Sequence, residues 1–71
     1  QVVARMSQDS IVHALSEIPP QFRDVVVLVD IGDFTYADAA QILDVPIGTV
    51  MSRLHRGRRA LKQKLAEDAV T

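Results

Sequence analysis

The side chains best suited to chemistry lie in the second half of the chain, where arginine, serine and histidine recur at helical spacing. On a helix, at about 100° per residue, Val50 marks a small and apolar side. The opposite side, within about 60°, carries Gly48, Ser52, His55, Arg56 and Arg59. Arginine pairs with the O6 and N7 acceptors of guanine, and serine or histidine bonds several bases. Such a face predicts contact with the bases and phosphates of nucleic acid.

The charge distribution is consistent with such a partner, because the net charge of −1 conceals an asymmetry. Residues 1–45 carry two arginines and seven acidic side chains, a net charge of −5, whereas residues 46–71 carry six basic and two acidic side chains, a net charge of +4. No acid occurs between Pro46 and Ala66. A basic end on a near-neutral chain predicts a partner that bears phosphates. Charge clustering alone fits a solvated helix face equally well.

Other chemistry has little support in the sequence. The absence of cysteine excludes disulfides, thiolate zinc sites and a thiol nucleophile. His13 and His55 have no acidic pair at ligand spacing, and Ser52 has only His55 as a neighbouring base. Asp30 and Asp33 flank a helix end, where solvated acids are commoner than an acid–base pair. We therefore expect no enzyme activity, no cofactor and no metal.

Length and composition define one small domain. The chain has 71 residues, of which 48% are hydrophobic and 24% charged, as in ordinary globular proteins. The longest strongly apolar run, residues 25–29, is too short to cross a membrane. The chain begins with Gln1 and shows no signal-peptide pattern, so we expect it to be part of a longer cytoplasmic protein.

Helical periodicity predicts an all-α domain of four helices. The first should begin at Ser7 as its N-cap, end at about residue 17 and stop at two prolines. The second should run over residues 20–31 and be followed by Gly32 with a positive φ. The valines of this segment would also suit a buried strand, but its length and its helical neighbours favour a helix.

The third helix is predicted over residues 36–43 with Thr35 as its cap, and the fourth from Pro46 to about residue 67. The apolar stripe of the fourth helix comprises Ile47, Val50, Leu54, Gly57, Leu61 and Leu65. The predicted boundaries are a linker remnant over residues 1–6, the domain over residues 7–67 and a tail over residues 68–71.

The last two helices have the spacing of a helix-turn-helix over about residues 35–56. The small side chains of Ala39 and Ala40 would let the two helices approach closely, with Val50 between them. Asp44 stands in the turn, and aspartate tolerates the left-handed region better than most residues. Gly57 is expected to face the other helices, and its replacement by alanine to stabilise the domain by about 1 kcal/mol.

These residues carry a resemblance to a known family. The stretch over residues 47–61, Ile-Gly-Thr-Val-Met-Ser-Arg-Leu-His-Arg-Gly-Arg-Arg-Ala-Leu, resembles the signature of domain 4 (region 4) of bacterial sigma factors, most of all the extracytoplasmic-function group. Leu-Ser-Glu-Ile-Pro-Pro-Gln-Phe at residues 15–22 and Asp-Phe-Thr-Tyr at residues 33–36 resemble the same group. The resemblance covers about residues 10–66, and the Gly-Thr-Val-x-Ser-Arg-Leu-x-Arg string is far more specific than a helix-turn-helix pattern alone.

The resemblance implies a sigma-factor domain that reads the −35 element of promoter DNA and directs RNA polymerase to start transcription in the bacterial cytoplasm. It further implies contact with the flap of the polymerase β subunit and control by an anti-sigma factor. The residues implied at the base edges are Met51, Ser52, His55 and Arg56. Those expected near the DNA backbone are Tyr36, Pro46, Thr49, Arg53 and Arg59. Asp44 stands where many such turns carry glycine, and Met51 where some members carry a basic residue.

Two further classes of function stay open on the sequence. The apolar load of the first two helices exceeds what one small core easily hides, which indicates a protein-interaction module. The helix-turn-helix would also suit the effector domain of an unrelated transcription regulator. A longer sequence with a domain that binds the −10 element would separate a sigma factor from such a regulator.

Overall fold

The computed structural model describes the backbone of residues 2–70 and the side chains of residues 9–67. In chain order its elements are α1 (Val2–Ser16), α2 (Pro20–Val26), the π-helical turn η1 (Val27–Ile31), α3 (Tyr36–Leu43) and α4 (Ile47–Val70). Over these residues the fold contains helices and no strand. The prediction of an all-α domain with four helices, the last two joined by a short turn, is confirmed.

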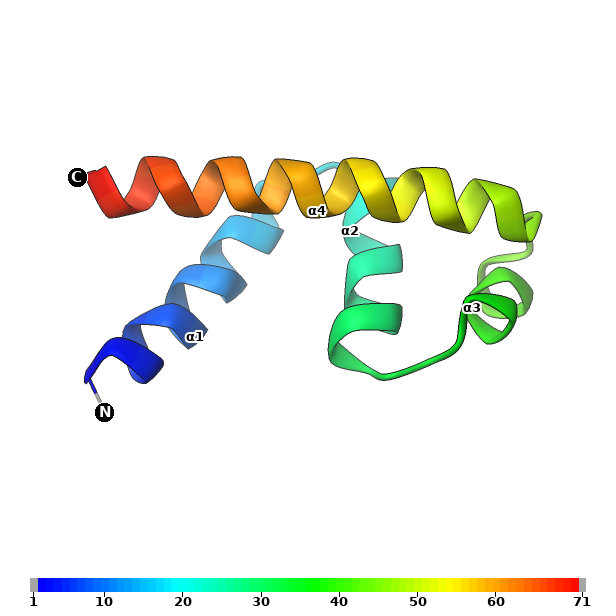
Figure 1. Ribbon diagram of the computed structural model, residues 1–71, viewed down its shortest axis with the longest axis horizontal. Helices are drawn as coiled ribbons and strands as arrows, with labels where there is room; N and C mark the ends of the chain where they lie inside the picture. The colour runs from blue at the N-terminus through cyan, green and yellow to red at the C-terminus, as the bar shows by residue number, and fades with distance from the viewer. Residues whose placement is uncertain (1, 71) are drawn as a thin grey trace.

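The longest helix, α4, forms one edge of the molecule, and the other helices lie along one side of it (Figure 1). The helices α1, α2 and α3 each pack against α4. The molecule is elongated in the direction of α4, with principal extents of 38 × 21 × 14 Å. The helix α4 is therefore both the helix on which the other helices pack to form the core and the second helix of the helix-turn-helix.

The core is formed where these helices meet α4. Its buried side chains are Ala14, Leu15, Ile18, Val25, Val26, Ala39, Val50 and Leu54. The predicted stripe of α4 is confirmed at Val50, Leu54 and Gly57, which are all buried. It is wrong at Ile47, which is 48% exposed, because at about 100° per residue Ile47 lies about 60° from Val50 around the helix.

The outer helix ends differ from the prediction. The helix α1 begins at Val2, so residues 2–6 are helical and Ser7 lies inside the helix instead of capping it. The helix α4 continues to Val70, past the predicted end at about residue 67. Neither end carries a proline or a glycine that would stop a helix, which explains both extensions. Gln1 and Thr71 lie outside the described residues, and the domain boundaries themselves stay a prediction.

The second predicted helix is present over its full length, but its last five residues wind as the π-helix η1. The amide of Gly32 donates to the carbonyl oxygen of Val27 at 2.8 Å and so closes this wider turn. Gly32 consequently keeps a helical φ of −85°, and the positive φ falls on Asp33 at 61°. The predicted conformation of Gly32 is wrong. Its lack of a side chain leaves room for the Phe34 ring, which would lie 3.1 Å from a Cβ there.

No helix within the described residues is long and apolar enough to cross a membrane.

Candidate DNA-binding site

The helix α3 begins with a side-chain cap. Thr35 has extended backbone angles (φ −70°, ψ 163°), and its Oγ1 accepts a hydrogen bond of 3.0 Å from the amide of Asp38. This bond satisfies one of the amides that a helix start leaves without a partner. Because α3 has only eight residues, its position depends on this cap and on packing. The predicted role of Thr35 is confirmed.

The turn between α3 and α4 is tight because Asp44 adopts the left-handed conformation, with φ 57° and ψ 51°. The amide of Val45 returns to the carbonyl oxygen of Ala40 at 3.0 Å, which ends α3. The carbonyl oxygen of Pro46 then accepts from the amides of Thr49 and Val50 at 3.0 and 3.2 Å, which starts α4. The predicted turn is therefore confirmed.

Packing fixes which side of α4 faces outward. Ala39 on α3 and Val50 on α4 are fully buried, and Ala40, Leu43 and Val45 pack against the same core. The small side chain of Ala39 lets the two helices approach closely, as the sequence predicts. With Val50 and Leu54 turned inward, the opposite side of α4 faces solvent.

Of the four residues predicted at the base edges, three lie on this outward side and Met51 lies at its border, about 100° from Val50 around the helix. Ser52, His55 and Arg56 are exposed, and Met51 is 53% exposed. The hydroxyl of Ser52 donates to the carbonyl oxygen of Thr49 at 3.2 Å, so its oxygen remains an acceptor for an outside donor. The structure thus places three of the predicted base-reading residues on one exposed face, with Met51 exposed beside it.

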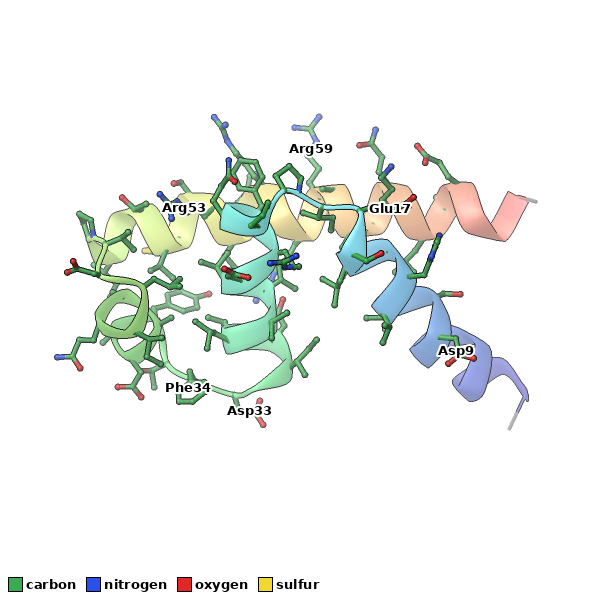
Figure 2. The ribbon with its side chains drawn as sticks, turned by 180° about the vertical axis from the view of Figure 1, so that it is seen from behind. Asp9, Glu17, Asp33, Phe34, Arg53 and Arg59 are labelled. Carbon is green, nitrogen blue, oxygen red and sulfur yellow. The ribbon has the colours of Figure 1, made fainter. Side chains whose placement is uncertain are left out.

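The residues predicted near the DNA backbone flank this face. Thr49 and Arg53 are half-buried at its edge, and Pro46 is exposed before the first turn of α4. Arg59 is exposed and projects from α4 away from the other helices (Figure 2). Tyr36 is exposed at the start of α3.

One arginine of α4 has a partner that the sequence reasoning missed. Arg58 Nε donates to Asp30 Oδ2 at 2.9 Å, and Arg58 Nη2 donates to Asp30 Oδ1 at 2.6 Å, across 28 residues of sequence. The hydrogen bond from Arg58, offset in part by desolvation, holds the pKa of Asp30 below its ordinary value of 3.8, and the same bond raises the pKa of Arg58. The sequence does indicate that Arg58 differs from the other arginines of α4: at about 100° per residue, Arg58 lies nearer the core side of the helix than Arg56 or Arg59 does.

A second, weaker connection joins α1 to α4. Glu17 Oε1 lies 4.0 Å from Lys64 Nζ and 3.8 Å from His13 Nε2. In Figure 2, Glu17 lies beside α4, where the chain leaves α1. These side chains are largely exposed, so each pair contributes little to stability. Among the described residues, no group of three histidine, aspartate or glutamate side chains could hold a metal ion.

A small helical domain whose second helix-turn-helix element presents a basic, solvent-facing side belongs to the class of domains that place a helix in the major groove of DNA. Residues 8–61 match the family model described as Sigma-70, region 4. The match covers well over half of the chain, and the chain therefore belongs to this family.

Curated relatives agree with this membership. The chain is 48% identical over 54 residues to ECF RNA polymerase sigma factor SigE of Mycolicibacterium smegmatis, covering 76% of this chain and 21% of that protein. It is 35% identical over 66 residues to ECF RNA polymerase sigma factor SigW of Bacillus subtilis, covering 93% of this chain and 35% of that protein. The chain thus spans about a fifth to a third of the length of these relatives. The resemblance to region 4 of the extracytoplasmic-function group is confirmed.

Proposed function

We propose that this chain reads the −35 element of promoter DNA as region 4 of a sigma factor, and so directs RNA polymerase to start transcription. The observation that carries the proposal is the outward face of α4, where Ser52, His55 and Arg56 are exposed within about 60° of the direction opposite the buried Val50. The role is one of binding, without catalysis, in the bacterial cytoplasm. The names of the relatives, ECF RNA polymerase sigma factors, support the same function.

Within this function, base edges and phosphates are read by different side chains. Arg56 suits the acceptors of a guanine, Ser52 and His55 suit several bases, and Met51 offers an apolar contact such as a thymine methyl group accepts. Thr49 and Arg53 at the edge of the face suit phosphates, as do Arg59, Pro46 and Tyr36 around them.

The start of α4 supports close approach to the DNA backbone. A Cβ built on Gly48 would have no atom within 4 Å, so this turn of the helix is open on its outer side. The first amides of a helix point outward without partners in the helix, and they favour an anion. The amide of Thr49 already donates to the carbonyl oxygen of Pro46, so a phosphate of the major-groove edge would fit the amide of Gly48 and the hydroxyl of Thr49.

Selection from a library of randomised duplexes tests the proposal. The 71-residue chain, immobilised at low salt, should enrich one short motif of double-stranded DNA over successive rounds. The charge-matched control is Lys62→Gln, which removes a positive charge from α4 beyond the proposed reading residues and should enrich the same motif. Recovery of unrelated sequences by the parent chain, with no common motif, would contradict promoter recognition.

We further propose that the exposed apolar side chains bind protein partners: the flap of the RNA polymerase β subunit and an anti-sigma factor. Val12 is 65% exposed on α1, and Ile42 is 54% exposed on α3. Val27 and Ile31 are exposed on η1. Because these apolar side chains lie on α1, η1 and α3 and the basic face lies on α4, the domain would be able to bind protein and DNA at once.

A competition assay with the chain, the selected duplex and the flap segment of polymerase tests this second role. An anti-sigma factor that acts by occlusion should displace the duplex or the flap segment. A tight inhibitor that displaces neither would rule out occlusion.

A further inference from the structure

The contact between Asp30 and Arg58 joins the helix that faces DNA to the element behind it. Asp30 lies on η1 and Arg58 lies in the middle of α4, and both carboxylate oxygens accept a hydrogen bond, at 2.6 and 2.9 Å. Fork-to-fork pairs of arginine and carboxylate fix direction as well as distance. Among the described side chains, the other contact of 4.0 Å or less between a basic residue of α4 and an acid is the looser pair of Lys64 with Glu17.

The position of Arg58 around the axis of α4 determines whether its contact with Asp30 resists rotation of the helix. At about 100° per residue, the core residues Val50, Leu54 and Gly57 lie close to one line along the helix. The apolar contacts of α4 hold it against its neighbours but are non-directional, whereas a two-bonded pair of arginine and carboxylate also fixes a direction. Arg58 lies about 80° from that line, so its bond to Asp30 resists this rotation directly.

The same contact keeps the Arg58 side chain from binding DNA phosphates. With its fork turned toward Asp30, Arg58 is not aimed at phosphates, although it lies between Arg56 and Arg59 in sequence. The Tyr36 phenol, at the start of α3, contributes in the same direction as Asp30 to the raised pKa of Arg58. Arg58 thus lies near polar groups of both η1 and α3, while its side chain stays 51% exposed.

We propose that Asp30 and Arg58 are positioning residues that set the rotation of α4, and so the angle at which Ser52, His55 and Arg56 meet the bases. The inference rests on the proposed recognition of promoter DNA. It predicts that the pair controls discrimination between sequences, whereas a pair that only stabilised the fold would change affinity for every sequence by the same factor.

The test compares two duplexes, the motif selected by the parent chain and a scrambled version of equal length, by fluorescence anisotropy. Measurements are made at a temperature where circular dichroism shows each variant to be folded. Asp30→Asn and Arg58→Ala should each reduce the ratio of the two affinities by about fivefold or more, the lower range for one lost base contact. The double variant should lose no more than either single variant, because both remove one interaction.

Asp33→Asn is the matched control. It removes the same charge three residues from Asp30, but Asp33 lies in the loop on the side of the molecule remote from α4 (Figure 2). Asparagine tolerates the positive φ of 61° found there. The ratio of affinities should stay at the parent value in this variant.

The salt dependence separates positioning from direct phosphate binding. Arg58→Ala should leave the slope of log affinity against log salt unchanged, whereas Arg59→Ala should reduce it by about 1. The inference is overturned if Asp30→Asn and Arg58→Ala both keep the parent ratio, if their losses add in the double variant, or if Arg58→Ala reduces the salt slope. If the parent chain itself does not distinguish the duplexes, the proposed function fails, and the inference fails with it.

Discussion

Gly57 on α4 lies so close to α2 that a Cβ built on it would stand 2.7 Å from the carbonyl oxygen of Phe22. The same Cβ would stand 2.6 Å from Cγ2 of Val26. The Val26 side chain is fully enclosed in the core and the Phe22 oxygen belongs to the backbone, so neither can yield easily. Glycine is therefore required at this crossing by space, since its φ is not positive.

Gly57→Ala should consequently destabilise the domain, against the gain that helix propensity alone predicts. Overpacking of a tight core costs about 1–3 kcal/mol, and with two contacts under 3.0 Å this cost should exceed the gain of about 1 kcal/mol from replacing a helical glycine. Thermal melts should show a lower midpoint for Gly57→Ala than for the parent. Gly48→Ala is the control on the same helix: open space surrounds its Cβ, so its midpoint should rise. A higher midpoint for Gly57→Ala would mean that α2 and α4 move apart freely.

The cap of α3 gives a second prediction. Thr35→Ala removes the oxygen that accepts from the amide of Asp38 and should cost about 1 kcal/mol of the free energy of unfolding. Thr35→Ser keeps that oxygen and should retain most of the stability. Urea titrations followed by circular dichroism measure both differences. Equal losses for the two variants would assign the effect to the lost methyl group instead of the cap.

The sequence predicted the local features of this fold because each depends on residues close together in the chain. Thr35 caps a helix that starts at the next residue, and Asp44 turns the chain by its own φ. The outward face of α4 follows from helical periodicity once Val50 is placed inside. The cap, the turn and the outward face together position the candidate site, so its local structure could be predicted from the sequence.

What the sequence could not predict depends on contacts between distant residues. The approach of α2 to Gly57 reverses the expected effect of a substitution there. The partner of Arg58 lies 28 residues away, so helical periodicity, which sets Arg58 apart from Arg56 and Arg59 by its angle, does not show that the partner is Asp30. The π-helical turn moves the positive φ from Gly32 to Asp33, because one wider hydrogen-bonded ring changes where the chain reverses.

Acid should weaken the fold partly through Asp30. Its pKa in the folded chain lies below the ordinary value of 3.8, so folding favours the ionised form. The resulting stabilisation is fully present above the unfolded pKa and is lost as the pH falls through the folded pKa. Since the Asp30 and Arg58 side chains are 33% and 51% exposed, solvent screening limits it to about 1 kcal/mol or less. Denaturation curves of the parent and of Asp30→Asn should differ at pH 7 and converge once the pH has fallen below the folded pKa of Asp30. If the denaturation curves of the two proteins keep the same separation across this range, Asp30 does not contribute to the loss of stability in acid.

Arg56 and Arg53 should differ in what they read, because they leave α4 in different directions. Arg56 is exposed on the outward face, whereas Arg53 is half-buried at its edge. Arg56→Ala should cost about 1–3 kcal/mol of binding free energy at one promoter position and relax the preference there. Arg53→Ala should weaken binding to all sequences alike and reduce the salt slope by about 1. The two variants remove the same charge and the same side chain, so each serves as the control for the other.

Duplex selection with each variant measures the preference, and anisotropy at several salt concentrations measures the slope. A motif recovered by Arg56→Ala that is identical to the parent motif would contradict base reading by Arg56. A changed motif for Arg53→Ala would indicate that Arg53 contacts bases instead of phosphates. Either result would imply that α4 enters the groove rotated about its axis from the orientation that its exposed face indicates. The contact of Arg58 with Asp30, which opposes such a rotation in the free domain, would then have to break on binding.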